Sequence, residues 1–109
     1  MDDPIRALAE PKRRAILELI ADEEMSAGEI AEHFDVTRPA VSQHLTVLKL
    51  AGLIAERRDG TKRLYRIEPD GISELRQFVE NLWSSALDTA RRLVEEDAGF
   101  GDRRAEDAG

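Results

Sequence analysis

Hydrophobic residues recur at helical spacing in the first part of this chain, and each run begins at a residue that favours a helix start. Asp3 and Pro4 open the first run, because aspartate can accept from unpaired backbone N–H groups and proline fits the first helical position. Pro11 opens a second run, in which apolar residues return three or four positions apart at Ala15, Ile16, Leu19 and Ile20. The pattern therefore predicts two short helices before residue 21.

A third and a fourth helix follow, separated by a short turn at Asp35-Val36. Ser26 and Glu29 have the spacing of a capping box, in which each side chain satisfies a backbone N–H at the helix start. Thr37 can cap the fourth helix, and Gly52 can adopt the positive φ that ends it. The third helix is expected to bury Ala27, Ile30, Ala31 and Phe34, and the fourth Val41, Leu45 and Leu48.

The second half of the chain changes from alternating to helical periodicity. Residues 53–58 and 62–67 alternate around Asp59-Gly60, which predicts a β-hairpin. Residues 70–96 then form the longest helical pattern, on the order of 40 Å if helical throughout. Two neighbouring faces of that helix are apolar, more than one small domain covers, so the pattern predicts pairing with a second copy. The charged, glycine-containing residues 98–109 are expected to form a disordered acidic tail.

These elements predict a mainly α fold with a small β-hairpin, in the order α-α-α-α-β-β-α. Helix, tight turn, helix and hairpin in succession form a winged helix-turn-helix. We therefore expect one domain over residues 1–97, with a DNA-reading unit at 26–67 and a dimerisation helix at 70–96. The fourth helix turns a polar side outward, and that side is the candidate reading surface.

The distribution of charge supports this interpretation, although the net charge is −7. Residues 36–66 hold seven basic and two acidic side chains, whereas the rest of the chain holds nine basic and 21 acidic ones. Salt screens distant charges beyond about 8–10 Å, so the local surplus governs the approach of phosphates. The basic side chains of the hairpin could also be ordinary protection of an exposed strand edge.

Composition excludes several other classes of protein. With no cysteine, the chain has no disulfide framework and no thiolate metal site. No apolar run approaches the roughly 18 residues of a membrane span, and no signal-peptide pattern opens the chain, so we expect a cytoplasmic protein without a membrane partner. It has no glycine loop for phosphates and no Ser/His/Asp set separable from helix capping, so we expect no enzymatic activity.

Three segments together resemble the ArsR/SmtB winged-helix repressors: SAGEIAEHF, TRPAVSQHLTVLKLAGLI and ERRDGTKRLYRIEP. The pattern S-x-H-L-x-x-L-x-x-A-G-L is matched at Ser42, His44, Leu45, Leu48, Ala51, Gly52 and Leu53. The resemblance extends from about Pro4 to Glu96. It implies a homodimeric transcriptional repressor that binds a palindromic operator in double-stranded DNA and pairs through its first and last helices.

The resemblance also implies which side chains act. The candidates for DNA binding are Thr37, Arg38, Ser42, Gln43, His44 and Thr46 on the fourth helix, and Arg57, Arg58, Lys62 and Arg63 on the wing. Gln43 is suited to pair with adenine through two hydrogen bonds. The candidates for the dimer interface are Ile5, Leu8, Leu75, Phe78, Val79, Leu82, Trp83, Ala86 and Leu93.

This chain departs from the metal-sensing members of that family. Their thiolate site lies on the helix before the reading helix, where residues 25–29 here are Met-Ser-Ala-Gly-Glu. Their other kind of site uses histidines on the last helix, which has none here. The sequence therefore predicts no metal and no cofactor. The signal for release stays open between an unknown small-molecule effector, a partner protein and the protein's own concentration.

Other interpretations stay open as well. The basic face could belong to a winged-helix module that binds a protein partner, or DNA without sequence preference, and a MarR-like regulator is a further alternative. His44 lies at the edge of the buried stripe, where packing is as reasonable as DNA contact. Phe78 and Trp83 suit a dimer core or the lining of an effector pocket. Leu50 projects to the outer side of its helix, where we expect it to pack against the wing.

Overall fold

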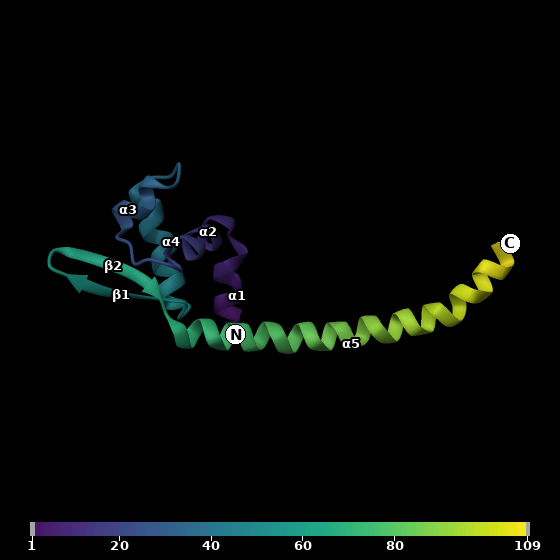
Figure 1. Cartoon of the computed structure of the whole chain (residues 1–109). Helices are drawn as coiled ribbons and strands as arrows, with labels where there is room; N and C mark the ends of the chain where they lie inside the picture. The colour runs from purple at the N-terminus through teal and green to yellow at the C-terminus, as the bar shows by residue number, and fades with distance from the viewer. Residues whose placement is uncertain (1, 109) are drawn as a thin grey trace. The chain divides into compact units, whose positions relative to one another are not determined.

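The computed structural model describes the backbone of residues 2–108 and the side chains of residues 3–97. Its elements are α1 (Asp2–Ala9), α2 (Pro11–Ile20), α3 (Ala27–Glu32), α4 (Arg38–Leu50), β1 (Ile54–Asp59), β2 (Lys62–Ile67) and α5 (Pro69–Ala108) (Figure 1). This order confirms the predicted succession of four helices, a hairpin and a last helix. Residues 1–76 and 77–109 form two compact units.

Side-chain caps fix the starts of α3 and α4, as the sequence predicts. The backbone N–H of Glu29 donates to Ser26 Oγ at 3.2 Å, and the N–H of Ser26 donates to Glu29 Oε1 at 3.3 Å, which completes the capping box. The backbone N–H of Ala40 donates to Thr37 Oγ1 at 3.2 Å. These bonds satisfy donors that a helix start leaves without a partner.

The first two helices begin at slightly different residues from those expected. α1 already begins at Asp2, so Asp3 and Pro4 lie within its first turn rather than before it. α2 does begin at Pro11, and the carboxylate of Glu10 caps it by accepting from the backbone N–H of Lys12 at 3.4 Å. Proline at this first position removes an N–H that would lack a helical partner.

α4 ends in a tight turn at Gly52, whose φ is +78°. The N–H of Leu53 donates to the carbonyl of Leu48 at 3.1 Å, and the N–H of Gly52 donates to the carbonyl of Lys49 at 3.0 Å. Together these bonds form a Schellman motif, which only a residue comfortable at positive φ allows. The turn returns Leu53 to Leu48, and both side chains are fully buried.

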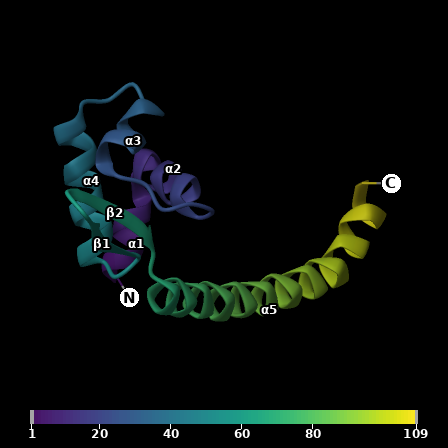
Figure 2. The ribbon, with the colours of Figure 1, turned by 60° about the vertical axis from the view of Figure 1, so that its left-hand side comes forward.

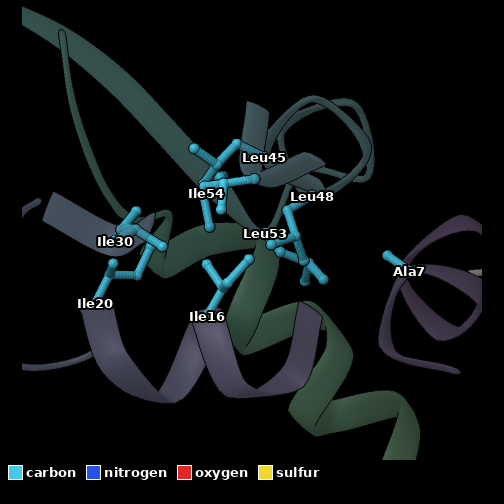
Figure 3. Close-up of a cluster of buried hydrophobic side chains, with 9 residues drawn as sticks. Ala7, Ile16, Ile20, Ile30, Leu45, Leu48, Leu53 and Ile54 are labelled. Carbon is cyan, nitrogen blue, oxygen red and sulfur yellow. The ribbon is translucent and has the colours of Figure 1, made fainter. Parts of the chain in front are cut away.

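One cluster of buried apolar side chains joins the helices of the first unit to β1. Figure 3 shows these side chains converging from α2, α3, α4 and the start of β1. Fully burying such a side chain stabilises the fold by roughly 1.5–3 kcal/mol. The predicted core positions of α4 are confirmed, but of those predicted in α3 only Ile30 is fully buried. The cluster consists of Ala7, Ile16, Ile20, Ile30, Val41, Leu45, Leu48, Leu53 and Ile54.

β1 and β2 pair in antiparallel register and lie beside α4 (Figures 1 and 2). The turn lies one residue later than predicted, because Asp59 still pairs with Lys62 and only Gly60 and Thr61 connect the strands. Gly60 has φ +66°, as the first central residue of a two-residue hairpin turn requires. On its other edge β2 gains a short bridge, in which Met25 and Tyr65 exchange backbone hydrogen bonds of 2.8 and 3.1 Å.

The first turn of α5 meets the end of α4 with backbone against backbone. A Cβ built on Gly71 would stand 1.7 Å from the carbonyl oxygen of Gly52, which no side chain tolerates. The N–H of Glu68 donates to the carbonyl of Leu53 at 3.0 Å, and the carbonyl of Glu68 accepts from the N–H of Ile72 at 3.1 Å. Gly71 is therefore required by this close approach and not by an unusual φ.

The second unit consists of the remainder of α5, which continues past the predicted end near residue 96 to Ala108. All side chains described in this unit are exposed. They include a series of large apolar ones, among them Leu82 at 59% and Trp83 at 64% exposure. The side chains of residues 98–109 lie outside the described residues, so the disordered tail stays a prediction.

Candidate nucleic-acid interface

The outer side of α4 presents a row of polar side chains. Ser42, Gln43 and Thr46 are exposed there, and Thr37 and Arg38 are exposed at the start of the helix. Two hydroxyls are engaged locally, since Thr37 accepts the capping bond and Thr46 donates to the carbonyl of Ser42 at 3.0 Å. The Gln43 amide makes no hydrogen bond within the described residues. It is the longest side chain of this row that offers both a donor and an acceptor to a base edge.

The same side of α4 also carries two apolar residues towards its C-terminal end. Val47 and Leu50 follow Gln43 at helical spacing, and they are 39% and 79% exposed. The expectation that Leu50 packs against the wing is therefore wrong. The wing instead meets α4 through a polar contact, because Lys49 on the neighbouring side reaches β1.

His44 turns away from this outer side and towards α2. It is half-buried, and its Nδ1 lies 3.4 Å from a guanidinium nitrogen of Arg13. Arg13 also donates from Nε to the carbonyl of Ala7 at 2.6 Å, at the end of α1. Because an arginine only donates, Nδ1 of His44 is the acceptor. This geometry favours packing over DNA contact for His44 and ties α4 to α1 and α2 through Arg13.

The tip of the wing places two arginines directly opposite each other. Arg58 pairs with Arg63 in the strand register, whereas the adjacent pair joins Asp59 to Lys62. Like charges facing each other across two strands repel, so the pair is costly in the isolated protein. An anion between or near them removes that cost, which makes this part of the wing suited to phosphate.

Arg57, which the sequence assigned to DNA, is occupied by another contact. Its guanidinium donates two hydrogen bonds to Glu24, with distances of 2.7 and 3.0 Å. The hydrogen bond from Arg57 lowers the pKa of Glu24, and Glu24 raises the pKa of Arg57 in turn. The pair joins β1 to the segment before α3, so Arg57 holds the wing in place while Arg58 remains available.

A second polar contact joins the wing to α4. Lys49 Nζ lies 2.9 Å from Glu56 Oε1, and Glu56 faces Tyr65 across the strands. The hydrogen bond from Lys49 lowers the pKa of Glu56. Partial burial raises the pKa of Tyr65, with a further contribution from the Glu56 charge and hydrogen bond. Neither wing contact was predicted from the sequence, since partners 7 and 33 residues apart leave no periodic signal.

A groove of about 420 Å³ lies between the N-terminal turns of α3 and α4 and the strand β2. Basic and hydroxyl side chains form most of its wall, and no carboxylate lines it. The Arg38 guanidinium, which lines the groove, lies beside Gly28, where a Cβ would be in ordinary contact at 3.6 Å. The lining residues are Ser26, Ala27, Arg38, Ser42, Thr61, Lys62, Arg63 and Tyr65.

The residues predicted for the dimer interface fall into two groups. Leu8 and Leu75 are half-buried and pack against the core cluster of the first unit. Ile5 on α1 is 42% exposed, and the stripe on α5 is exposed throughout, namely Phe78, Val79, Leu82, Trp83, Ala86 and Leu93. Exposed apolar residues concentrated in this way are typical of a surface that binds another protein.

Among the side chains of residues 3–97, no group of three or more histidine, aspartate or glutamate residues is arranged to hold a metal ion. Within the same part of the chain, no helix is long and apolar enough to cross a membrane.

The known proteins that this chain resembles are helix-turn-helix proteins and transcriptional regulators. The helix-turn-helix domain family matches residues 8–57. The HTH-type transcriptional regulator Rv2034 of Mycobacterium tuberculosis is 43% identical over 90 residues, which cover 83% of this chain and 84% of that protein. The transcriptional repressor SdpR of Bacillus subtilis is 36% identical, with coverage of 72% and 92%.

One similar solved structure is described both by its family and as a homodimer. The homodimeric winged helix-turn-helix DNA-binding domain of Mb0332 from Mycobacterium bovis, a possible ArsR-family transcriptional regulator, is 31% identical. It superimposes with a TM-score of 0.63 over 76% of this chain and 77% of the domain. The chain belongs to the ArsR family. As an ArsR-type winged helix-turn-helix protein it is a DNA-binding transcriptional regulator, and its relatives are regulators rather than enzymes.

Proposed function

We propose that this ArsR-type regulator is a homodimeric repressor that binds an inverted-repeat operator through α4 and the wing. The observation that carries the proposal is the exposed polar row of α4 next to a wing whose tip arginines face each other across the two strands. A helix fits the major groove of B-DNA, and basic strands beside it reach the backbone. Two copies related by a two-fold axis would read half-sites about 34–36 Å apart.

Gln43 is the proposed base-reading residue. It lies midway along the row formed with Ser42 and Thr46, and its amide can donate to and accept from one adenine edge. Ser42 and Arg38 lie beside it, towards the groove at the wing. His44 and Arg57, which face Arg13 and Glu24, are proposed to position these elements.

The proposed dimer would bury the apolar stripe of α5 together with the exposed part of α1. Six apolar residues of that stripe are exposed within residues 77–97, and Leu82 and Trp83 are more than half exposed. Burying such side chains contributes roughly 1.5–3 kcal/mol each, which is ample for association. The homodimeric Mb0332 domain supports this arrangement, and SdpR supports a repressor.

The experiment is selection of bound fragments from random DNA, followed by titration of the enriched site. A sequence-specific dimer is expected to enrich a palindrome, whereas a module that binds DNA without preference enriches none. On the enriched site, Gln43→Ala is expected to relax discrimination at one position per half-site by about 1–3 kcal/mol.

Ser73→Ala is the matched control for that substitution, since it removes an exposed polar side chain of α5 away from the reading row. It should leave the preference unchanged. Equal losses by Gln43→Ala on the enriched and the scrambled duplex would remove Gln43 from the reading role.

A further inference from the structure

The groove between α3, α4 and β2 is a concave site in which cations and hydroxyls converge. Arg38 comes from α4, and Lys62 and Arg63 come from β2, so three positive charges from two elements line one cavity. Ser26, Ser42 and Thr61 add three hydroxyl groups. In a chain with 23 acidic and 16 basic side chains, a cavity lined by three cations and no carboxylate is suited to an anion.

The charges of Lys62 and Arg63 act on Glu29 and Glu56, respectively, but none of the three cations is held in a direct contact to a described residue. Arg38, Lys62 and Arg63 make no hydrogen bond or ion pair with the described residues, whereas Arg57 and Lys49 of the same surface do. The nearest acid on α3, Glu29, is held by the backbone N–H of Ser26 and does not line the cavity. The opposed Arg58 and Arg63 add repulsion that an anion would relieve.

The Arg38 guanidinium lies beside Gly28, in the first turn of α3. A Cβ on Gly28 would lie 3.6–3.9 Å from the Arg38 guanidinium, so this side chain rests on the first turn of α3. Arg38, which the resemblance proposes for DNA binding, therefore faces the groove. Its planar head, with five donors, is the group best suited to grip tetrahedral oxyanions.

We propose that this groove is a phosphoryl-binding site, filled by one backbone phosphate of each operator half-site when DNA is bound. Free phosphate-bearing molecules have the same chemistry and compete for the site, which gives the regulator a means of release without metal. The proposal rests on the proposed function for its DNA occupant, because α4 must lie in the major groove for the backbone to cross β2. Phosphate groups accept from several donors at once, as this arrangement of arginine, lysine and hydroxyl groups provides.

The DNA occupant is tested on the selected duplex by replacing single phosphates with neutral methylphosphonates. For the full-length wild-type protein, affinity is expected to fall about tenfold at one position in each half-site. Lys62→Gln and Arg38→Gln are each expected to lose affinity on the unmodified duplex and to lose little more at that position. Arg66→Gln is the matched control, since it removes the same charge from β2 outside the groove.

The free occupant is tested with pyrophosphate on the DNA-free protein, by amide chemical shifts. Shifts are expected at Ser42, Thr61 and Lys62, to be lost in Lys62→Gln and retained in Arg66→Gln. Pyrophosphate should also displace DNA from the wild type better than chloride of equal ionic strength. The chemical-shift measurement needs no operator, so it succeeds or fails independently of whether a palindrome is enriched.

Each of the two experiments identifies one occupant of the groove. A coupled methylphosphonate position identifies the DNA backbone as an occupant, and pyrophosphate shifts in the groove identify a free phosphoryl group as one. Equal methylphosphonate losses in wild type, Lys62→Gln and Arg38→Gln, together with no groove shifts, would overturn the proposal even if selection enriches a palindrome.

Discussion

At the scale of single residues, Gly71 matters more for stability than its place in a helix suggests. Replacing a helical glycine by alanine normally stabilises a protein by roughly 0.5–1 kcal/mol. At Gly71 the new Cβ would stand 1.7 Å from the Gly52 carbonyl oxygen, so the start of α5 must move. We expect Gly71→Ala to destabilise the protein by about 1–3 kcal/mol, measured by urea unfolding at fixed protomer concentration.

Gly28→Ala is the matched control, because it also places a methyl group in the first turn of a helix. Its Cβ would be in ordinary contact, 3.6 Å from the Arg38 side chain. We expect this variant to be as stable as the wild type or more stable. If the two variants unfolded at the same urea concentration, the close approach at Gly71 would not be a determinant of stability.

Residue patterns predicted the helix caps but could not predict such contacts. Ser26, Glu29, Thr37 and Gly52 were identified because capping depends on a few residues close in sequence. The requirement for glycine at position 71 was not predicted, since nothing close in sequence shows which backbone approaches it. The same holds for His44 and Arg13, which lie 31 residues apart in the chain.

At the scale of elements, the wing is fixed by two ion pairs, and only some of its arginines are available for DNA. Arg57 is engaged with Glu24, while the adjacent Arg58 faces Arg63. We expect Arg58→Ala to weaken binding to matched and scrambled DNA alike and to reduce the slope of log affinity against log salt by about 1. Binding titrations over a series of salt concentrations measure this slope.

Arg57→Ala provides the comparison on the same strand, with the same change of charge. Because Arg57 is paired with Glu24, we expect a smaller change of slope. Any loss of DNA affinity should arise from a shift of the wing. A slope change in Arg57→Ala as large as that in Arg58→Ala would show that the Glu24 pair opens when DNA binds.

The carboxylates of these pairs also predict a pH dependence. Hydrogen bonds from Arg57, Ser26 and Lys49 lower the pKa of Glu24, Glu29 and Glu56, respectively, from the ordinary value of 4.5. A lowered pKa in the folded state means that the stabilisation is fully present above pH 4.5 and is lost as the pH falls through the folded-state pKa. We expect the melting temperature to decrease below about pH 4.5, followed by circular dichroism.

The double variant Glu24→Gln/Glu56→Gln tests the origin of that decrease. It removes two of the three carboxylates, so its melting temperature should start lower near neutral pH and depend less on pH in the acid range. An unchanged slope in the double variant would assign the acid sensitivity to other carboxylates.

Local pattern predicted the hairpin well but misplaced its turn. Alternation and the Asp-Gly pair located both strands, yet the turn is Gly60-Thr61 because Asp59 pairs with Lys62. The bridge from Met25 to Tyr65 was not predicted, since a single residue has no periodicity. The expectation that Leu50 packs against the wing was wrong, because Lys49 rather than Leu50 makes the contact to the wing.

At the scale of the whole molecule, the order of the elements and the charge distribution sufficed to identify a winged helix-turn-helix. The core positions of α4 and the long α5 followed from helical periodicity. The groove at the wing did not, because it is formed by residues from 26 to 65 that only the fold brings together. The surface that pairs two copies likewise depends on the folded chain, although the apolar stripe of α5 is visible in the sequence.

The apolar stripe of α5 is expected to hold two copies of the chain together. Leu82 is 59% exposed in a unit whose described side chains are all exposed, so its burial is expected only between two copies. Leu82→Asp would place a carboxylate in that interface, and an unpaired buried charge costs several kcal/mol. Sedimentation is expected to show a monomer for Leu82→Asp, and the circular dichroism spectrum should remain that of a helical protein. Asn81→Asp adds the same charge at the adjacent, exposed position and should sediment as the wild type.

Since two half-sites require two copies, the Leu82→Asp monomer should also lose affinity for a palindrome far more than for a single half-site. A dimer that survived the substitution would place the interface elsewhere on the chain.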